Sequence, residues 1–114
     1  MDGCIFCKIA NHEIEVAALY EDDDVIAFPD INPVAPVHIL AVPKDHIPGI
    51  GDVGPENSGI VARIWEVIPS LAAESGIAED GFRVVANSGD DAGQSVPHLH
   101  FHVLGGRRMG WPPG

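Results

Sequence analysis

Apolar and polar residues alternate strictly near the C-terminal end of the chain, in the run Val-Pro-His-Leu-His-Phe-His-Val-Leu at positions 96–104. A period of two is typical of a β-strand, whose successive side chains point to opposite faces of a sheet. The run therefore predicts a strand from His98 to Leu104. One face of this strand carries three histidines, which are His98, His100 and His102. The other face is turned toward the core and carries Leu99, Phe101 and Val103.

Two helices are predicted upstream of this strand. A short helix is expected from Cys4 to Ala10, and a longer one from about Pro55 to Ser75, where apolar residues recur with a period of 3.6. Pro69 falls inside the longer helix, where a proline removes a backbone donor and clashes with the preceding turn. The long helix is therefore expected to kink or split at Pro69.

Four further strands are indicated by short apolar runs between turn residues. They are expected at Val16 to Tyr20, Val25 to Phe28, Val37 to Val42 and Gly81 to Ser88. With the histidine strand they form a sheet of about five strands. The chain is thus predicted to be one α+β domain over residues 1–114, without linkers or internal repeats.

Charge and composition exclude several functions. The formal net charge is -11 and the chain has only six Lys and Arg residues, which argues against non-specific binding to nucleic acid. No apolar run approaches the roughly 20 residues of a membrane span, and no N-terminal leader is recognisable. A soluble, cytoplasmic protein is expected, with no membrane and no nucleic-acid partner. Any bound phosphate would have to be held locally, by backbone amides, helix ends or histidines.

The histidine strand holds half of the six histidines of the chain, and this concentration indicates a site. A single histidine in a strand is usually a solvated or hydrogen-bonded residue. Three histidines that alternate strictly with apolar core residues indicate a functional site instead. Imidazoles serve both as metal ligands and as acid, base or nucleophile in catalysis. The spacing leaves both possibilities open.

Cys4 and Cys7 form a C-x-x-C motif at the N-terminus. In a cytosolic chain this spacing indicates a zinc site, a redox pair or coincidence. A redox motif of the thioredoxin kind follows a strand, and no strand precedes Cys4. A zinc site needs two more ligands, for which His46 and one of the three strand histidines are candidates. Otherwise the two thiols are small buried apolar groups.

Two irregular segments flank the histidine strand. The loop from Gly89 to Pro97 contains glycines and leads directly into the strand, and such a loop can turn several N–H groups toward one anion. The tail from Gly105 to Gly114 is too rich in glycine and proline for a helix or strand. Its Trp111 is expected to be buried against its own fold or against a partner subunit.

The motif His98-x-His100-x-His102-x-x, within the run from Gly93 to Arg107, resembles the signature of the histidine-triad (HIT) superfamily. The ending Trp-Pro-Pro-Gly at 111–114 is similar to the tail of its nucleotide-binding branch, the Hint proteins. Further matches lie at Ile5-Phe6, Phe28-x-Asp30-Ile31-x-Pro33, Ala35-Pro36-x-His38 and Val42-Pro43-Lys44-x-His46. The resemblance spans nearly the whole chain and implies a HIT-like fold with an antiparallel sheet.

The resemblance implies an enzyme that acts at the α-phosphate of purine nucleoside 5′-phosphoramidates. His100 would be the nucleophile and would form a nucleotidyl-histidine intermediate, which water hydrolyses to the nucleoside monophosphate. His102 would donate to a phosphate oxygen, and Ser95 with the backbone of Gly93 and Gln94 would offset the developing charge. His38 would handle a proton or position the nucleophile.

The resemblance also assigns the nucleotide and metal ligands. Asp30 would accept the ribose hydroxyls, and Asn87 would contact the sugar-phosphate. An apolar cleft for the base would be formed by Ile5, Phe6, Phe28 and Ile31. A structural Zn²⁺ would be held by four ligands, which are Cys4, Cys7, His46 and His98.

A homodimer is implied as well, with the helix that carries Trp65 and the C-terminal tail as contact surfaces and Trp111 near the partner's active site. Three alternatives remain open. The first is a dinucleoside polyphosphate hydrolase of the Fhit-like branch, and the second is a nucleotide-binding interaction module with incidental turnover. The third is a catalytic metal site built from His98, His100 and His102.

Overall fold

The structure is a computed structural model that describes residues 3–114. Its helical elements are α1 (Ile5–Ala10), α2 (Ser58–Glu74) and two short 3-10 helices, η1 (Ile50–Asp52) and η2 (Asp90–Ala92). Its strands are β1 (Tyr20–Glu21), β2 (Val25–Pro29), β3 (Val37–Pro43), β4 (Phe82–Val85) and β5 (Phe101–Gly105). All neighbouring strands are antiparallel, in the order β1-β2-β3-β5-β4. This confirms the predicted α+β fold with one five-stranded antiparallel sheet.

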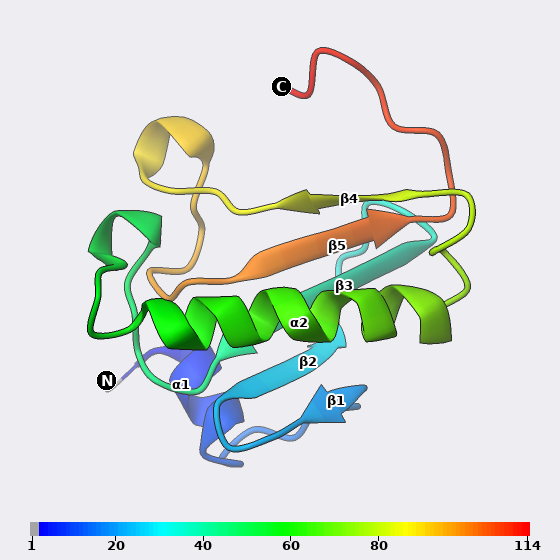
Figure 1. The fold of residues 1–114 in the computed structure, drawn as a ribbon. Coiled ribbons are helices and arrows are strands. Elements are labelled where there is room, and N and C mark those ends of the chain that lie inside the picture. The colour runs from blue at the N-terminus through cyan, green and yellow to red at the C-terminus, as the bar shows by residue number, and fades with distance from the viewer. Residues whose placement is uncertain (1–2) are drawn as a thin grey trace.

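The two faces of the sheet are covered by different helices (Figure 1). On one face, Ile64, Ile68 and Leu71 of α2 pack against side chains of β2, β3 and β5. On the other face, Phe6 and Ile9 of α1 form a smaller cluster. The sheet therefore separates a large core under α2 from a small one under α1, and the strands contribute alternate residues to each.

Several predicted boundaries were wrong. The first strand is only Tyr20–Glu21, because Ala18 donates its N–H to Val16 in a local turn and Val16 packs on the small cluster. The last strand begins at Phe101 and not at His98. The reason is that Leu99 donates its N–H to the carbonyl of Ile47 (2.6 Å), a residue outside the sheet.

Two further expectations need correction. β4 covers Phe82–Val85 only, so residues 86–88 are not part of a strand. The long helix is not split, because α2 continues through Pro69 to Glu74. Pro69 has no N–H, so the carbonyl of the residue four positions earlier has no helical partner. Pro69 lies on the exposed side of α2, where water can donate to that carbonyl instead.

Candidate functional site

The three histidines of the triad lie on the α1 side of the sheet. Leu99, Phe101 and Val103 all belong to the core under α2, which confirms the predicted alternation even though the strand itself starts later. His98 is fully buried and His100 is 4% exposed, whereas His102 is half-buried. The chain is therefore extended before β5 as well, and it presents successive imidazoles along one face.

Cys4, Cys7, His46 and His98 form one cluster, with their ligand atoms all within 4.8 Å of one another. Cys4 caps α1, because its Sγ accepts the N–H of Cys7. The short helix thus brings both thiols to the same point. His46 follows β3, and His98 precedes β5. The distances are 3.4 Å from Cys4 Sγ to His98 Nδ1, 3.2 Å from Cys7 Sγ to His46 Nδ1 and 3.2 Å between the two Nδ1 atoms.

These distances are equal to or slightly shorter than those expected between the ligand atoms of a tetrahedral zinc site. With Zn–N bonds of about 2.0–2.1 Å and Zn–S bonds of about 2.3 Å, the ligand atoms of a tetrahedron lie about 3.3–3.8 Å apart. His98 is also prepared as a ligand, because its Nε2 donates to the carbonyl of Pro43 (2.8 Å) and leaves a lone pair on Nδ1. Burial and the adjacent Cys4 raise the pKa of the Cys7 thiol, so a cation is needed to hold both thiolates together. The donor set is thus compatible with zinc.

His100 is held in one tautomer by the main chain. Its Nδ1 lies 2.7 Å from the carbonyl oxygen of His98, which can only accept, so Nδ1 carries the proton. Nε2 of the neutral ring then holds a lone pair. The ring packs edge-on against Phe6 (5.1 Å between centroids) and against His102 (5.1 Å). His100 therefore has the protonation pattern of a nucleophile or base.

His38 and His102 form a second pair across β3 and β5. The N–H of Val34 donates to Nδ1 of His38 (3.1 Å), so the neutral ring of His38 carries its proton on Nε2. Nε2 of His38 lies 2.8 Å from Nδ1 of His102 and 3.4 Å from the carboxylate of Asp30. His102 therefore accepts at Nδ1, and its own proton sits on Nε2. This arrangement makes His102 a hydrogen-bond donor.

The same tautomers exclude two metal sites. Asp30, His38 and His102 have ligand atoms within 4.8 Å of one another, but Nε2 of His38 is protonated and its lone pair on Nδ1 already accepts from Val34. The alternative of a catalytic metal held by the whole triad also fails. Nε2 of His98 is bonded to Pro43, and its Nδ1 faces the two cysteines.

An apolar cleft of about 320 Å³ lies against α1 on this side of the sheet. This volume lies within the range of small-molecule sites. Eight of the predicted site residues line the cleft and are Ile5, Phe6, Phe28, Asp30, Ile31, Ser95, His100 and His102. His38 is not part of the lining, but its Nε2 contacts Nδ1 of His102. The structure thus brings together most of the residues that the resemblance assigned to nucleotide and catalysis.

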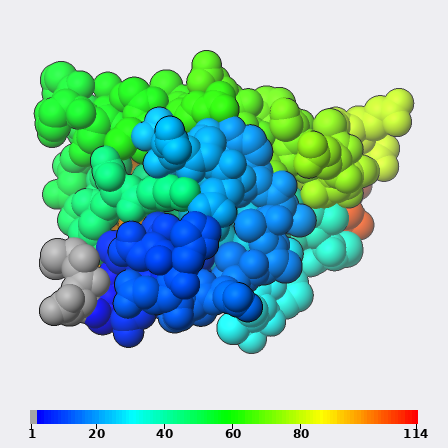
Figure 2. All heavy atoms as spheres, turned by 90° about the horizontal axis from the view of Figure 1, so that it is seen from below, coloured from blue at the N-terminus to red at the C-terminus, as the bar shows by residue number. Residues whose placement is uncertain are grey.

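Other residues of the cleft were not found from the sequence. They are Ile9, Ile14, Glu15, Val16, Pro29, Leu40 and Val96. Ile9 could have been found, because it follows Ile5 by one helical turn. Residues 14–16 gave no such signal, because the chain reaches the cleft only by turning back after α1. Figure 2 shows α1 and this following segment, in dark blue and blue, over the lower face of the molecule.

Four predicted nucleotide ligands are absent from the lining of this cleft, and they are Asn87, Gly93, Gln94 and Trp111. Gln94 instead holds its own loop, because its amide contacts Gly89 N, the Pro48 carbonyl and the Val96 carbonyl. The N–H groups of Gly93 and Gln94 donate within the loop, to Asp90 and Gly89. They are therefore engaged, and within residues 3–114 the N–H of Ser95 is the one amide of 93–95 with no acceptor.

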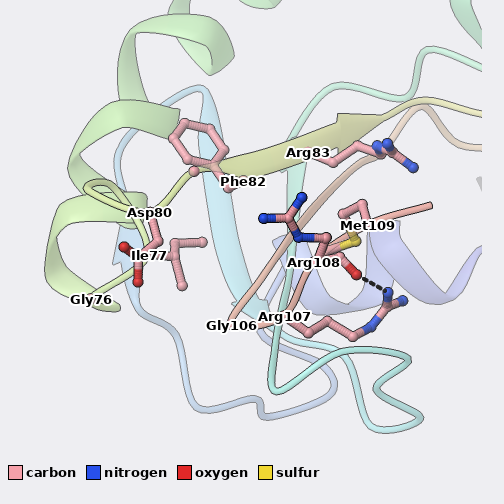
Figure 3. A pocket seen from close by; sticks show the side chains of 10 residues that line it. Gly76, Ile77, Asp80, Phe82, Arg83, Gly106, Arg107, Arg108 and Met109 are labelled. Carbon is pink, nitrogen blue, oxygen red and sulfur yellow. Dashed lines mark hydrogen bonds between the residues drawn. The ribbon is translucent and has the colours of Figure 1, made fainter. Parts of the chain in front are cut away.

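Trp111 is 82% exposed within the single chain, so it is not buried against its own fold. It stacks with the guanidinium of Arg83, which lies 6.0 Å from its ring. A larger cavity of about 670 Å³ lies nearby, between the start of β4 and the tail (Figure 3). Arg107 and Arg108 also line it, but none of the predicted catalytic, nucleotide or metal residues does. Its chemistry is separate from that of the cleft.

The folded protein should lose stability as His102 becomes protonated. Burial, and then the neighbouring His100 and His38, lower the pKa of His102 to about 4, with Asp30 opposing the shift. The unfolded chain binds this proton at its ordinary pKa of about 6.5, so it gains protons first as the pH falls. The free energy of unfolding should therefore decline from about pH 6.5 toward pH 4.

Urea unfolding at a series of pH values measures this effect. We expect a steeper decline for the wild-type protein than for His102→Gln, in which every other titrating group is retained. Burial also lowers the pKa of His38, so part of the decline should remain in the variant. Equal pH dependence of the two proteins would contradict a shifted His102.

Comparisons with known proteins agree with this geometry. A family model described as "HIT domain" matches residues 11–109. The crystal structure of a HIT family hydrolase from Legionella pneumophila is similar at a TM-score of 0.94 and 47% identity, covering 97% of this chain and 99% of that one. A histidine triad protein from Clostridium difficile gives a TM-score of 0.92 and 50% identity, with 96% of each chain covered. A 14 kDa zinc-binding protein of Zea mays is 46% identical over 112 residues, 96% of this chain and 87% of that protein.

The fold and site define a small α+β protein with an imidazole-lined cleft beside a Cys2His2 cluster. The chain belongs to the HIT family, and its neighbours support a hydrolase in the broad sense. No helix among residues 3–114 has the length and apolar character needed to cross a membrane.

Proposed function

We propose that this protein is a zinc-bearing, Hint-like nucleotide hydrolase that cleaves purine nucleoside 5′-phosphoramidates and releases the nucleoside monophosphate. The observation that carries the proposal is the tautomer of His100. Its Nδ1–H is fixed on the His98 carbonyl at 2.7 Å, and its ring lines the apolar cleft with a lone pair on Nε2. A neutral imidazole so oriented is a good nucleophile at neutral pH and later departs readily from phosphorus.

The reaction proceeds in two transfers at the α-phosphorus. In the first, Nε2 of His100 forms a bond to phosphorus as the bond to the leaving amine breaks, and the amine departs with a proton taken up from solvent. Ser95 lines the cleft and can assist that proton transfer. In the second, the oxygen of a water molecule bonds to phosphorus, the P–N bond to His100 breaks, and a water proton is released. His100 is thereby restored with its lone pair.

His102 stabilises the charge that develops on phosphate. Its Nε2–H is available because its Nδ1 accepts from His38, so it can donate to a non-bridging oxygen. Asp30 contacts His38 and lines the cleft, which suits it to accept from ribose hydroxyls. Phe6, Phe28 and Ile31 form apolar walls for the base; Ile31 is 91% exposed and gains cover when a base is bound. This division of roles supports a nucleotide as substrate.

A structural Zn²⁺ completes the proposal. When bound to Cys4, Cys7, His46 and His98 it would crosslink the N-terminal segment to the sheet, and four protein ligands leave no open position for substrate. Through the His98 carbonyl this cluster is one hydrogen bond from His100. The likeness to the maize zinc-binding protein supports the assignment.

The substrate class is tested with adenosine 5′-phosphoramidate. We expect release of AMP, detected by chromatography, and a phosphorus–nitrogen adduct on His100 when a slow nucleotide analogue is used. A dinucleoside polyphosphate should be cleaved far more slowly. Faster cleavage of the dinucleotide would favour the Fhit-like alternative. Binding of AMP without turnover of either substrate would favour an interaction module.

The proposal includes a homodimer. Trp65 on α2 is 51% exposed although it packs against Phe101, and Trp111 is 82% exposed. β4 is also an edge strand of the sheet, and such edges invite pairing. Exposed tryptophans on a subunit of 12.1 kDa indicate a surface that a second copy covers.

Light scattering at micromolar concentration measures the oligomeric state. We expect about twice the mass of one chain for the wild-type protein and a monomer for Trp65→Arg. Leu19→Arg is the matched control, because Leu19 is 44% exposed and directly precedes β1, the edge of the sheet opposite to β4, and it should remain a dimer. A wild-type monomer would refute this part of the proposal.

A further inference from the structure

We infer that Glu15 selects the base, so that the cleft prefers guanine to adenine nucleotides. The inference rests on the proposed function and extends it to the identity of the purine. Five polar residues line the cleft, and they are Glu15, Asp30, Ser95, His100 and His102. In the proposed function Ser95, His100 and His102 act at the phosphate, and Asp30 binds the ribose. Glu15 is the remaining polar residue of the lining, and none of these roles is assigned to it.

Glu15 reaches the cleft from the segment that follows α1, whereas His100 packs against the first turn of that helix. α1 starts at the metal cluster, where Cys4 caps it, and Phe6 of its first turn packs against His100. After the helix the chain turns back, because Glu13 and Ile14 both donate their N–H groups to the carbonyl of Lys8 in the last turn. Glu15 therefore lies beside the C-terminal end of α1. A nucleotide whose phosphate is at His100 extends its base toward this end.

The carboxylate of Glu15 has no competing partner. Within residues 3–114 no hydrogen bond or ion pair engages it, whereas Glu21 is paired with Lys44 and His12. Asp30 differs as well, because it accepts the N–H of Asn32 and contacts His38. Glu15 is exposed next to the apolar residues Ile14 and Val16, so an incoming base can reach it. The Glu15 carboxylate is therefore free to accept hydrogen bonds from a bound base.

A carboxylate discriminates between the two purines by hydrogen-bond type. It has acceptors only, and the Watson–Crick edge of guanine offers two adjacent donors, N1–H and the N2 amino group. Such a pair of charge-assisted bonds to one carboxylate is bidentate. Adenine presents the N1 lone pair at the corresponding place, which the carboxylate repels. A bidentate contact of this kind discriminates between bases by about tenfold to a hundredfold.

Calorimetric titration with GMP and AMP tests the inference on the zinc-loaded protein. We expect the wild-type protein to bind GMP at least about tenfold more tightly than AMP. In Glu15→Ala the two affinities should become equal within about twofold, and in Glu15→Gln the preference should shrink. Glu13→Gln is the matched control, because Glu13 is exposed but is not part of the cleft lining, and it should keep the wild-type ratio.

A second probe, 1-methyl-GMP, isolates the N1–H donor. It should bind wild-type protein about as weakly as AMP does, and Glu15→Ala should not distinguish it from GMP. An unchanged ratio of GMP to AMP affinity in Glu15→Ala, or a wild-type preference for AMP, would overturn the role of Glu15 while leaving the proposed function intact. Failure of both nucleotides to bind would instead overturn the proposed function, and this inference with it.

Discussion

His100→Ala should lower kcat for AMP release from adenosine 5′-phosphoramidate by about 10⁴-fold or more, the scale seen when a covalent nucleophile is removed. Alanine offers no nitrogen to attack phosphorus, so the nucleotidyl intermediate cannot form. KM should change little by comparison, because the contacts of Phe6, Phe28 and Asp30 with the nucleotide remain. Steady-state kinetics together with AMP titration separates the two effects.

The variant needs a control for folding, because His100 is 4% exposed and packs against Phe6. Thermal unfolding and zinc content of His100→Ala should therefore be measured on the same sample. His12→Ala is the matched histidine control, since His12 lies on the surface and pairs with Glu21 outside the cleft. It should retain activity. Wild-type turnover by a folded, zinc-loaded His100→Ala protein would rule out His100 as nucleophile.

The sequence predicted the face of each triad residue well, because a period of two is a local property of the chain. Leu99 and Phe101 lie in the core under α2, and His100 and His102 lie on the opposite face, as the alternation required. The division of labour among the histidines was implied by the resemblance and not by periodicity. What separates them physically is their hydrogen-bond partners, which are distant in sequence.

Those partners explain why the rest was not predictable. The contact between His38 and His102 depends on the register of β3 and β5, in which Leu40 pairs with His102, and no local signal fixes that register. The loop before β5 shows the same limit. Its glycines indicated a nest for an anion, yet the N–H groups of Gly93 and Gln94 close the loop on itself. Glu15 entered the cleft only through the turn after α1.

Loss of one zinc ligand should destabilise the protein and also impair the nucleophile. We expect Cys7→Ala to bind no stoichiometric zinc and to unfold roughly 10 °C or more below the wild-type protein, since binding of a structural zinc contributes to folding free energy. Cys4 caps α1 and Cys7 lies within it, and Ile5 and Phe6 of the cleft lie between the two thiols in the chain. Release of α1 from the sheet should therefore raise KM as well.

The effect on kcat distinguishes a zinc site from two packed thiols. If Cys4 and Cys7 were only small buried apolar groups, Cys7→Ala would remove one sulfur atom and cost about 1 kcal/mol, with kcat unchanged. If they hold a metal with His98, the main chain that fixes Nδ1–H of His100 loses its anchor, and kcat should fall together with stability. Atomic absorption, thermal unfolding and steady-state kinetics on wild-type protein, Cys7→Ala and His46→Ala provide the comparison. If one zinc ion is shared, both variants should lose zinc, thermal stability and kcat together, although their substitutions lie on opposite sides of the cluster. Stable and active variants would contradict the zinc site.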